Sequence, residues 1–276
     1  MKNIKPYSGD SKVTYDEAVN RKKGGAQKNL LLKNAAWIHG RYDLYHKHFL
    51  SLNLSPVLSV LCPTVKLKDV LLSMYGYNAK AVRDIRSDIY KRQSKATKEF
   101  CQYCGIEEVG TMDHFLPKEE YPEYALNGEN LFPCCSKCND LKGEKDPSLF
   151  LNLYLDQLPT TQYLFVDIGI QNNDLSFRFY LHNDGKIDAA LFAKIETHFK
   201  ELDLLDRMRI AADGAQTDFI YRAKREFIKG LQVDFVSIVQ DEVKYNKQYY
   251  GDNHWRYVWE DALVTSPVFW NYVSTL

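Results

Sequence analysis

Apolar residues recur at helical spacing in two stretches near the start of the chain. In residues 26–52 they are Leu30, Leu31, Ala35, Trp37, Ile38, Tyr42, Leu44, Tyr45 and Phe49. This period predicts an amphipathic helix. A second helix is predicted over residues 65–93, with a break near Gly76-Tyr77-Asn78. By contrast, residues 11–26 combine a charge run with Gly24-Gly25, which favours an extended or loosely ordered arm.

The second half of the chain changes pattern twice. Residues 162–170 (QYLFVDIGI) and 175–181 (LSFRFYL) are rich in branched and aromatic side chains and flank Asn172-Asn173, which predicts a β-hairpin. Helices are then predicted over 189–204, 205–230 and 233–250, with Gly214 and Gly230 as interruptions or stops. The aromatic end, residues 254–276, is assigned to core packing, with docking onto another chain as the alternative. The fold class expected is α+β.

Composition places the chain among ordinary globular proteins. Apolar residues make up 45% and charged residues 26% of the 276 positions, so a disordered chain is excluded. No segment approaches the roughly 18 uninterrupted apolar residues of a membrane helix. The first twelve residues lack the apolar centre of a signal peptide. We therefore expect a cytoplasmic protein without a membrane partner.

The formal net charge of zero hides an uneven distribution. Residues 1–100 carry 19 Lys and Arg against 8 Asp and Glu, whereas residues 101–150 carry 4 against 10 and residues 151–276 carry 13 against 18. The densest basic stretch comprises Lys80, Arg83, Arg86, Lys91, Arg92, Lys95 and Lys98. A basic first third is suited to a phosphate backbone, although a solvated helix face is the alternative.

Five of the six cysteines are clustered, and only Cys62, in an apolar run, lies apart as an expected buried residue. The knuckles Cys101-x-x-Cys104 and Cys135-x-x-Cys138 each place two thiolates within reach of one ion. A tetrahedral site of four thiolates suits a structural zinc ion. Cys134 adjoins the second knuckle and competes for the ligand position, but the spacing of Cys135 to Cys138 repeats the first knuckle.

Polar residues between and after the knuckles are not explained by zinc: Asp113-His114, Asn130, Asn139 and Lys142. The order C-x-x-C-G, D-H-x-x-P, N-L and C-x-x-C-N-x-x-K-G resembles the four-cysteine branch of the HNH endonuclease family. That resemblance implies a treble-clef-like ββα-metal core, here embedded in a mainly helical chain with a C-terminal hairpin and helices. It covers about one sixth of the chain.

Each residue of the motif has a chemical reason. Phosphodiester hydrolysis needs a base and positive charge at the phosphorane, and the neutral imidazole of His114 is the candidate base. Asp113 and Asn139 offer oxygen ligands for Mg²⁺ or Mn²⁺. The resemblance implies that Asn130 holds the strand that carries His114 and orients its imidazole. Lys142, one turn beyond Asn139, is expected to contact a phosphate.

Adjacent strand residues point to opposite faces, so β-structure is expected to end or twist at Asp113-His114, in agreement with Pro117. Glu107-Glu108 and Glu119-Glu120 are interpreted as solvated charges. The predicted regions are a basic helical part (1–98), the nuclease core (99–150) and an α+β part (151–276).

The resemblance makes DNA the first-choice substrate, with a 5′-phosphate and a 3′-hydroxyl as products, and leaves RNA open. The layout, including residues 197–209 (THFKELDLLDRMR), also resembles the nuclease subunits of Septu-type anti-phage systems, which pair with an ATPase. The alternatives are a stand-alone restriction or homing-type nuclease and a non-catalytic zinc-stabilised binding module.

Overall fold

The structure is a computed structural model that describes residues 1–57 and 62–276. The chain divides into two compact units. The N-terminal unit consists of residues 3–103 and 108–157, and the C-terminal unit of residues 1–2, 104–107 and 158–276. The boundaries expected from the sequence, at residues 98 and 150, follow motif and composition and stay a prediction.

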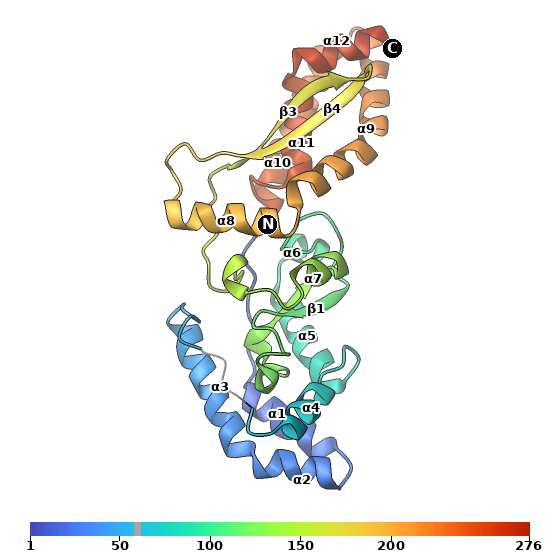
Figure 1. The fold of residues 1–276 in the computed structure, drawn as a ribbon. Coiled ribbons are helices and arrows are strands. Elements are labelled where there is room, and N and C mark those ends of the chain that lie inside the picture. Colours follow the sequence, from blue (N-terminus) through green and yellow to red (C-terminus); the bar gives the residue numbers. More distant parts are fainter. Residues whose placement is uncertain (58–61) are drawn as a thin grey trace. The chain divides into compact units, whose positions relative to one another are not determined.

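Helices dominate the described part of the N-terminal unit, and a small hairpin lies among them (Figure 1). The helices are α1 (Ser11–Arg21), α2 (Ala26–Lys33), α3 (Ala35–Leu50), α4 (Val65–Met74), α5 (Lys80–Arg92), α6 (Lys95–Glu99) and α7 (Ser136–Lys142). The strands are β1 (Thr111–His114) and β2 (Leu131–Cys134), and the 3₁₀ turns are η1 (Pro122–Tyr124), η2 (Gly128–Asn130) and η3 (Pro147–Leu149).

The prediction of a loose arm over residues 11–26 was wrong, because α1 occupies most of it. Asp10 caps this helix by accepting a hydrogen bond from the backbone N–H of Lys12 at 2.7 Å. Tyr15 and Val19, one turn apart, are buried against neighbouring helices. These two side chains define the buried face of α1, and the positions around them are mostly polar.

The two helices predicted next are confirmed, each in two pieces. The first divides at Asn34, which ends α2 and whose side-chain N–H donates to the Leu30 carbonyl at 2.8 Å. The second divides at the expected Gly76-Tyr77-Asn78 segment into α4 and α5. On α5 the residues Ala81, Val82, Ile85 and Ile89 are buried, whereas its basic side chains other than Arg86 are exposed.

The hairpin of β1 and β2 is antiparallel, with Asp113 opposite Phe132 and His114 opposite Leu131. Helix α7 follows β2 directly and contacts β1. The order strand, strand, helix is the ββα arrangement expected around the motif. Gly143 ends α7 with a positive φ of 50°, a conformation that favours glycine.

The C-terminal unit contains the second hairpin, β3 (Leu164–Gln171) and β4 (Asp174–Leu181). Its turn residues Asn172 and Asn173 both have positive φ, as a two-residue hairpin turn requires. The helices are α8 (Ala189–Glu201), α9 (Leu204–Ile228), α10 (Gln232–Tyr250), α11 (Trp255–Thr265) and α12 (Pro267–Thr275). The predicted hairpin and helices are confirmed, except that α9 continues through Gly214 without interruption.

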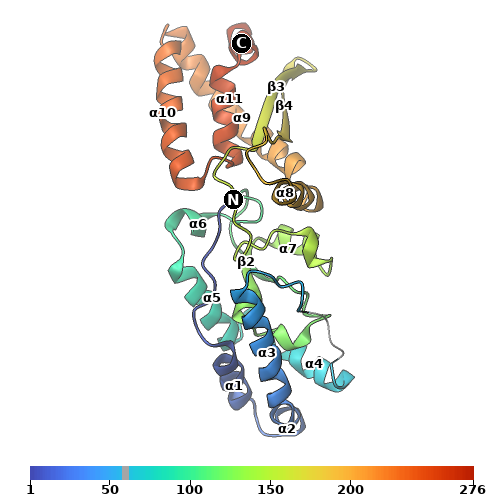
Figure 2. The ribbon, with the colours of Figure 1, turned by 90° about the vertical axis from the view of Figure 1, so that its left-hand side faces the viewer.

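The core of the C-terminal unit lies between the hairpin and its helices. Strand β4 packs against α9 and β3 against α11, an arrangement visible in Figure 2. Trp259 and Phe269 are buried there, and the Trp259 ring packs edge-to-face with Phe177 and at a tilt against Phe219. The aromatic end of the chain therefore serves mainly as core. Among the described residues, no helix combines the length and apolarity needed to cross a bilayer.

Candidate active site

Four cysteines converge at the base of the ββα segment. The Sγ atoms of Cys101, Cys104, Cys135 and Cys138 all lie within 4.8 Å of one another, and all four residues are buried. None of these thiols is in a disulfide. The cluster contains Cys135 and not its neighbour Cys134, which lies on β2 opposite Thr111. The cluster has the members that the cysteine spacing predicted, and their binding of zinc stays a prediction.

The donor set and its surroundings fit a tetrahedral zinc ion. The Cys135 Sγ accepts from the backbone N–H of Cys138 at 3.4 Å and so caps α7. The Cys104 Sγ accepts from the N–H of Ile106, also at 3.4 Å. Such donors stabilise negative charge on sulfur, which is the form that binds metal. The sulfur cluster thus fixes the start of α7, the helix that carries Asn139.

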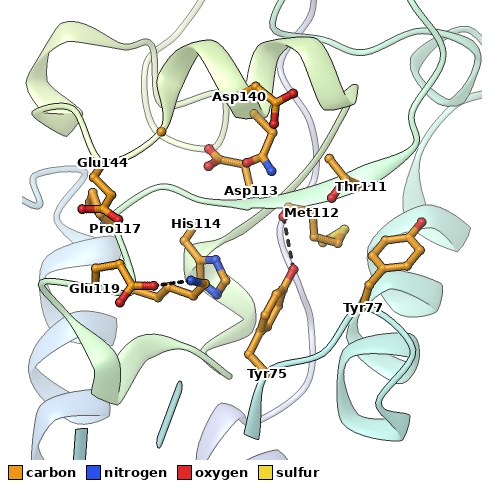
Figure 3. Close-up of a pocket in the computed structure, with 13 residues that line it drawn as sticks. Tyr75, Tyr77, Thr111, Met112, Asp113, His114, Pro117, Glu119, Asp140 and Glu144 are labelled. Carbon is orange, nitrogen blue, oxygen red and sulfur yellow. Dashed lines mark hydrogen bonds and ion pairs between the residues drawn. The ribbon is translucent and has the colours of Figure 1, made fainter. Parts of the chain in front are cut away.

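A cavity of about 460 Å³ opens beside the hairpin, and three of the motif residues, Asp113, His114 and Asn139, line it. Figure 3 shows the side chains of Asp113 and His114 leaving β1 in different directions. Tyr75 and Tyr77 stand on one side, and Pro117, Glu119 and Glu144 on the other. The strand ends at His114, as expected, so two consecutive residues serve one cavity.

Asp113 is held from two directions. Its Oδ1 lies 3.2 Å from the Lys142 ammonium, and its Oδ2 accepts a hydrogen bond of 3.1 Å from the Tyr103 hydroxyl. Burial raises the pKa of Asp113, and the charge of Lys142 opposes that shift. Burial also raises the pKa of Tyr103, so its phenol stays a donor. The carboxylate is consequently oriented before any ligand arrives.

Lys142 departs from its expected place. Its side chain is fully buried, and its ammonium also donates to the His114 carbonyl at 2.7 Å. It is not among the residues that line the cavity. The sequence suggested a contact with phosphate, but α7 packs on β1 and turns this long side chain inward. In this arrangement Lys142 holds Asp113 and the end of β1.

The imidazole of His114 is held by two contacts, a hydrogen bond to a backbone carbonyl and the ring of Tyr75. The Nε2 lies 3.1 Å from the carbonyl oxygen of Ala125, so Nε2 carries the proton and donates it. Nδ1 then keeps its lone pair and has no hydrogen-bond partner among the described residues. Burial lowers the pKa of His114 to about 3. The ring of Tyr75 meets the imidazole edge-to-face at 4.4 Å and restricts its rotation.

Asn130 is fully buried and holds the chain directly after His114. Its Oδ1 accepts from the Leu116 N–H at 2.8 Å, and its Nδ2 donates to the Leu116 carbonyl at 3.0 Å. Its own carbonyl accepts from the Phe115 N–H at 2.8 Å. One side chain thus closes both backbone groups of Leu116. The imidazole itself is oriented by Ala125 rather than by Asn130.

The cavity also offers a fit for a hard divalent cation. Asp113 and the half-buried Asn139 present oxygen donors to it, and the Asn139 side chain has no hydrogen-bond partner in the described parts of the chain. Oxygen ligands with room for water are what Mg²⁺ and Mn²⁺ prefer. Asp113 and Asn139 are the residues that would hold such an ion.

Several contributors come from outside the motif. Tyr75 and Tyr77 belong to the segment between α4 and α5, and the Ala125 carbonyl comes from the end of η1. Glu119, interpreted as a solvated charge, lines the cavity and pairs with Lys118 at 2.5 Å. Of these, only Tyr75 and Tyr77 could have been noticed in the sequence, because they flank Gly76 at the predicted helix break. The Ala125 carbonyl is a backbone group, and no residue type in the sequence indicates it.

Comparison with known proteins agrees with this geometry. Residues 101–145 match the family described as HNH endonuclease. Over 236 residues the chain is 23% identical to Protein ea31 of Escherichia phage lambda, and the match covers 78% of each protein. A 51-residue segment is 45% identical to the Septu protein PtuB of Bacillus thuringiensis, and it spans 17% of this chain and 20% of that protein. No solved structure matches the chain.

Proposed function

Residues 101–145 form an HNH endonuclease domain, a phosphodiester hydrolase, and from this premise we propose that the chain cuts nucleic acid, with DNA as its first substrate. The observation that carries the proposal is the hydrogen bond from His114 Nε2 to the Ala125 carbonyl. It places the proton on one nitrogen and leaves the other free to act as a base. A ring nitrogen that keeps its lone pair and faces the cavity is what a general base requires.

The residues divide the work of hydrolysis among themselves. His114 Nδ1 takes a proton from water as the water oxygen attacks phosphorus and the bond to the 3′-oxygen breaks. The leaving 3′-oxygen takes up a proton from solvent, so the products are a 5′-phosphate and a 3′-hydroxyl. A divalent cation, when bound, supplies the positive charge that stabilises the phosphorane and the leaving oxygen. Asp113 and Asn139 would hold it. Lys142, Tyr103 and Asn130 keep Asp113 and His114 in place.

Charge on the N-terminal unit supports a polyanionic substrate. Lys80, Arg83, Lys91 and Arg92 are exposed on α5 or at its ends, in the same unit as the cavity. Lysine and arginine rows of this kind bind a phosphate backbone through counterion release, whatever its base sequence. DNA and RNA share this backbone charge, so RNA is the second candidate.

We also propose a role in bacterial anti-phage defence together with an ATPase partner. Support comes from the 45% identity of a 51-residue segment to a protein named for the Septu system. The matching segment is short, so the partner would bind parts of the chain that this similarity does not cover. Copurification of an ATPase with the tagged chain from its native host would separate this role from that of a stand-alone restriction or homing-type nuclease.

The first experiment is cleavage of supercoiled plasmid and of bulk RNA by the purified chain with Mg²⁺ or Mn²⁺, beside the variant His114→Ala. We expect cutting that a chelator of divalent ions stops, and a loss of roughly 10²–10⁴-fold in rate for His114→Ala. The exposed His182→Ala is the matched control and should cut as well as the wild type. Undiminished cutting by His114→Ala would refute the assignment of the base.

The remaining alternative is a zinc-stabilised module that binds without cutting. Such a module predicts that the wild type and His114→Ala bind nucleic acid equally. It also predicts that neither protein cuts, with or without the ATPase partner. An inactive chain that gains activity on addition of its ATPase would exclude that alternative.

A further inference from the structure

The wall of the cavity formed by Tyr75 and Tyr77 has no part in the hydrolysis described above. Both residues come from the short segment between α4 and α5, outside the HNH endonuclease domain. Figure 3 shows their rings on the same side of the cavity, beside Met112 and Thr111. Two aromatic rings next to a phosphate-cleaving centre are an arrangement that can receive a nucleobase.

The Tyr75 and Tyr77 rings differ in the contacts that they already make. The Tyr75 ring packs against His114, and its hydroxyl donates to the Met112 carbonyl at 3.2 Å. It is therefore part of the wall. Tyr77 is 37% exposed, which is unusual for a ring that lines a cavity. The Tyr77 ring is the one that remains available to a ligand.

One face of Tyr77 is fixed by a cation. The Arg86 guanidinium carbon lies 4.1 Å from the centre of the ring, the distance of a close cation–π contact. The Arg86 Nη1 is buried and has no hydrogen-bond partner among the described residues, so stacking on Tyr77 is what this guanidinium does. The stack holds the ring in one orientation before substrate binds, which lowers the entropic cost of using it.

The opposite side of the cavity is acidic. Asp140 and Glu144 line it, are exposed, and have no ion-pair partner in the part of the chain that the structure describes. Carboxylates there repel any phosphates beyond the one being cut. A duplex brings a second phosphate backbone alongside the first. A single strand has no second backbone, and its bases are unpaired. The basic helix α5 begins three residues after Tyr77, at Lys80.

We infer that Tyr77 stacks on an unpaired base next to the scissile phosphate, and that the chain prefers single-stranded or locally unpaired DNA over intact duplex. In a duplex each base is already stacked between its neighbours, so this ring has no free base face to bind. The inference rests on the proposed function, since it assigns the substrate class to the same cavity. Tyr77 is a specificity residue and touches no reacting atom.

The test uses the full chain and a DNA oligonucleotide that carries 2-aminopurine, first as a single strand and then within a duplex. Binding is measured in the His114→Ala background, which does not require cutting. We expect the fluorescence of the single strand to be quenched on binding. Tyr77→Ala should abolish the quenching and weaken binding by roughly 5- to 150-fold, the usual contribution of one stacked base. Tyr77→Phe, which keeps the ring, should behave as the parent.

Tyr221→Ala is the matched control, because Tyr221 is 67% exposed on α9 of the C-terminal unit. With the active chain, Tyr77→Ala should raise KM for the single strand and leave kcat within about twofold. Equal losses on single strand and duplex, or quenching that survives Tyr77→Ala, would overturn the inference. Cutting confined to intact duplex would overturn it while the proposed function stands. Single-strand cutting that does not depend on His114 would instead refute the assignment of His114 as the base and leave this inference standing.

Discussion

Lys142 and Asp113 form a buried ion pair, with 3.2 Å between Nζ and Oδ1. The same ammonium donates to the His114 carbonyl at 2.7 Å, so one cation holds two consecutive residues at the end of β1. Helix α7 contributes this cation from the position where the chain leaves the helix at Gly143. The packing of α7 on β1 is thereby coupled directly to the orientation of the proposed metal ligand.

Lys142→Met should destabilise the chain more than any exposed lysine substitution. It leaves the Asp113 carboxylate buried without its cation, and breaking a buried pair in this way costs about 3–5 kcal/mol. Urea unfolding followed by circular dichroism measures the change. Lys137→Met, exposed on the same helix, is the control and should stay within about 0.5 kcal/mol of the wild type. Equal midpoints for the two variants would contradict the assigned role of Lys142.

Asn130→Ala should reduce both stability and activity. Both backbone groups of Leu116 lose their partner while remaining buried, at about 1–3 kcal/mol for each unsatisfied group. Because Leu116 lies two residues beyond His114, we also expect kcat to fall with little change in KM. Plasmid cleavage beside urea unfolding tests this, with the exposed Asn20→Ala as control. A stable variant with normal kcat would show that Asn130 does not hold this segment.

The two neighbouring cysteines should respond differently to the same substitution. Cys135→Ser removes one of the four clustered thiols, so we expect zinc to fall well below one ion per chain and the thermal midpoint to drop. Cys134→Ser leaves the cluster intact and should keep its zinc. Elemental analysis of the purified proteins measures the metal content. Zinc loss in Cys134→Ser with retention in Cys135→Ser would reverse the assignment.

Arg41→Met should destabilise the chain in a manner that depends on pH. Arg41 Nε lies 2.8 Å from Glu123 Oε1, and the pair anchors η1, which ends at the carbonyl that orients His114. Burial raises the pKa of Glu123 even with Arg41 present, and removing the cation should raise it further. A carboxyl with a raised pKa in the folded state is tolerated when protonated and costs stability once ionised.

The difference in unfolding free energy between wild type and Arg41→Met should therefore be small below about pH 4.5, the pKa of Glu123 in the unfolded chain. It should grow as pH rises above the pKa of Glu123 in the folded wild type. Near pH 7 it should reach about 3–5 kcal/mol. Urea titrations at several pH values measure it. The variant Glu123→Gln with Arg41→Met should remove the pH dependence. A difference that grows toward acid pH would contradict the account.

The parts of the fold that the sequence predicted are those with local signals. The periodicity of residues 26–52 predicted helix, and the knuckle spacing located the sulfur cluster. The prediction for α1 failed because only two of its residues, Tyr15 and Val19, are buried. Two positions one turn apart are too few to establish a period.

The site divides in the same way. Asp113, His114 and Asn139 occupy a fixed motif, and the structure brings them to one cavity. The direction of Lys142 could not be predicted, since a flexible four-carbon side chain follows the packing of its helix. Tyr77 and Arg86 meet across nine positions and a turn, and no spacing rule for a single helix brings two such residues together.

The sulfur cluster also has a consequence for the order in which the protein is made. The ribosome releases Cys101 and Cys104 before His114, but Cys135 and Cys138 only afterwards. Until the last of these thiols emerges, a zinc ion at this position cannot close the loop that contains β1, and α7 has no fixed start. The nascent chain therefore carries His114, the proposed base, in an unassembled state during translation. If zinc fills the cluster as proposed, cells starved of zinc would accumulate a finished polypeptide in which this segment stays unassembled.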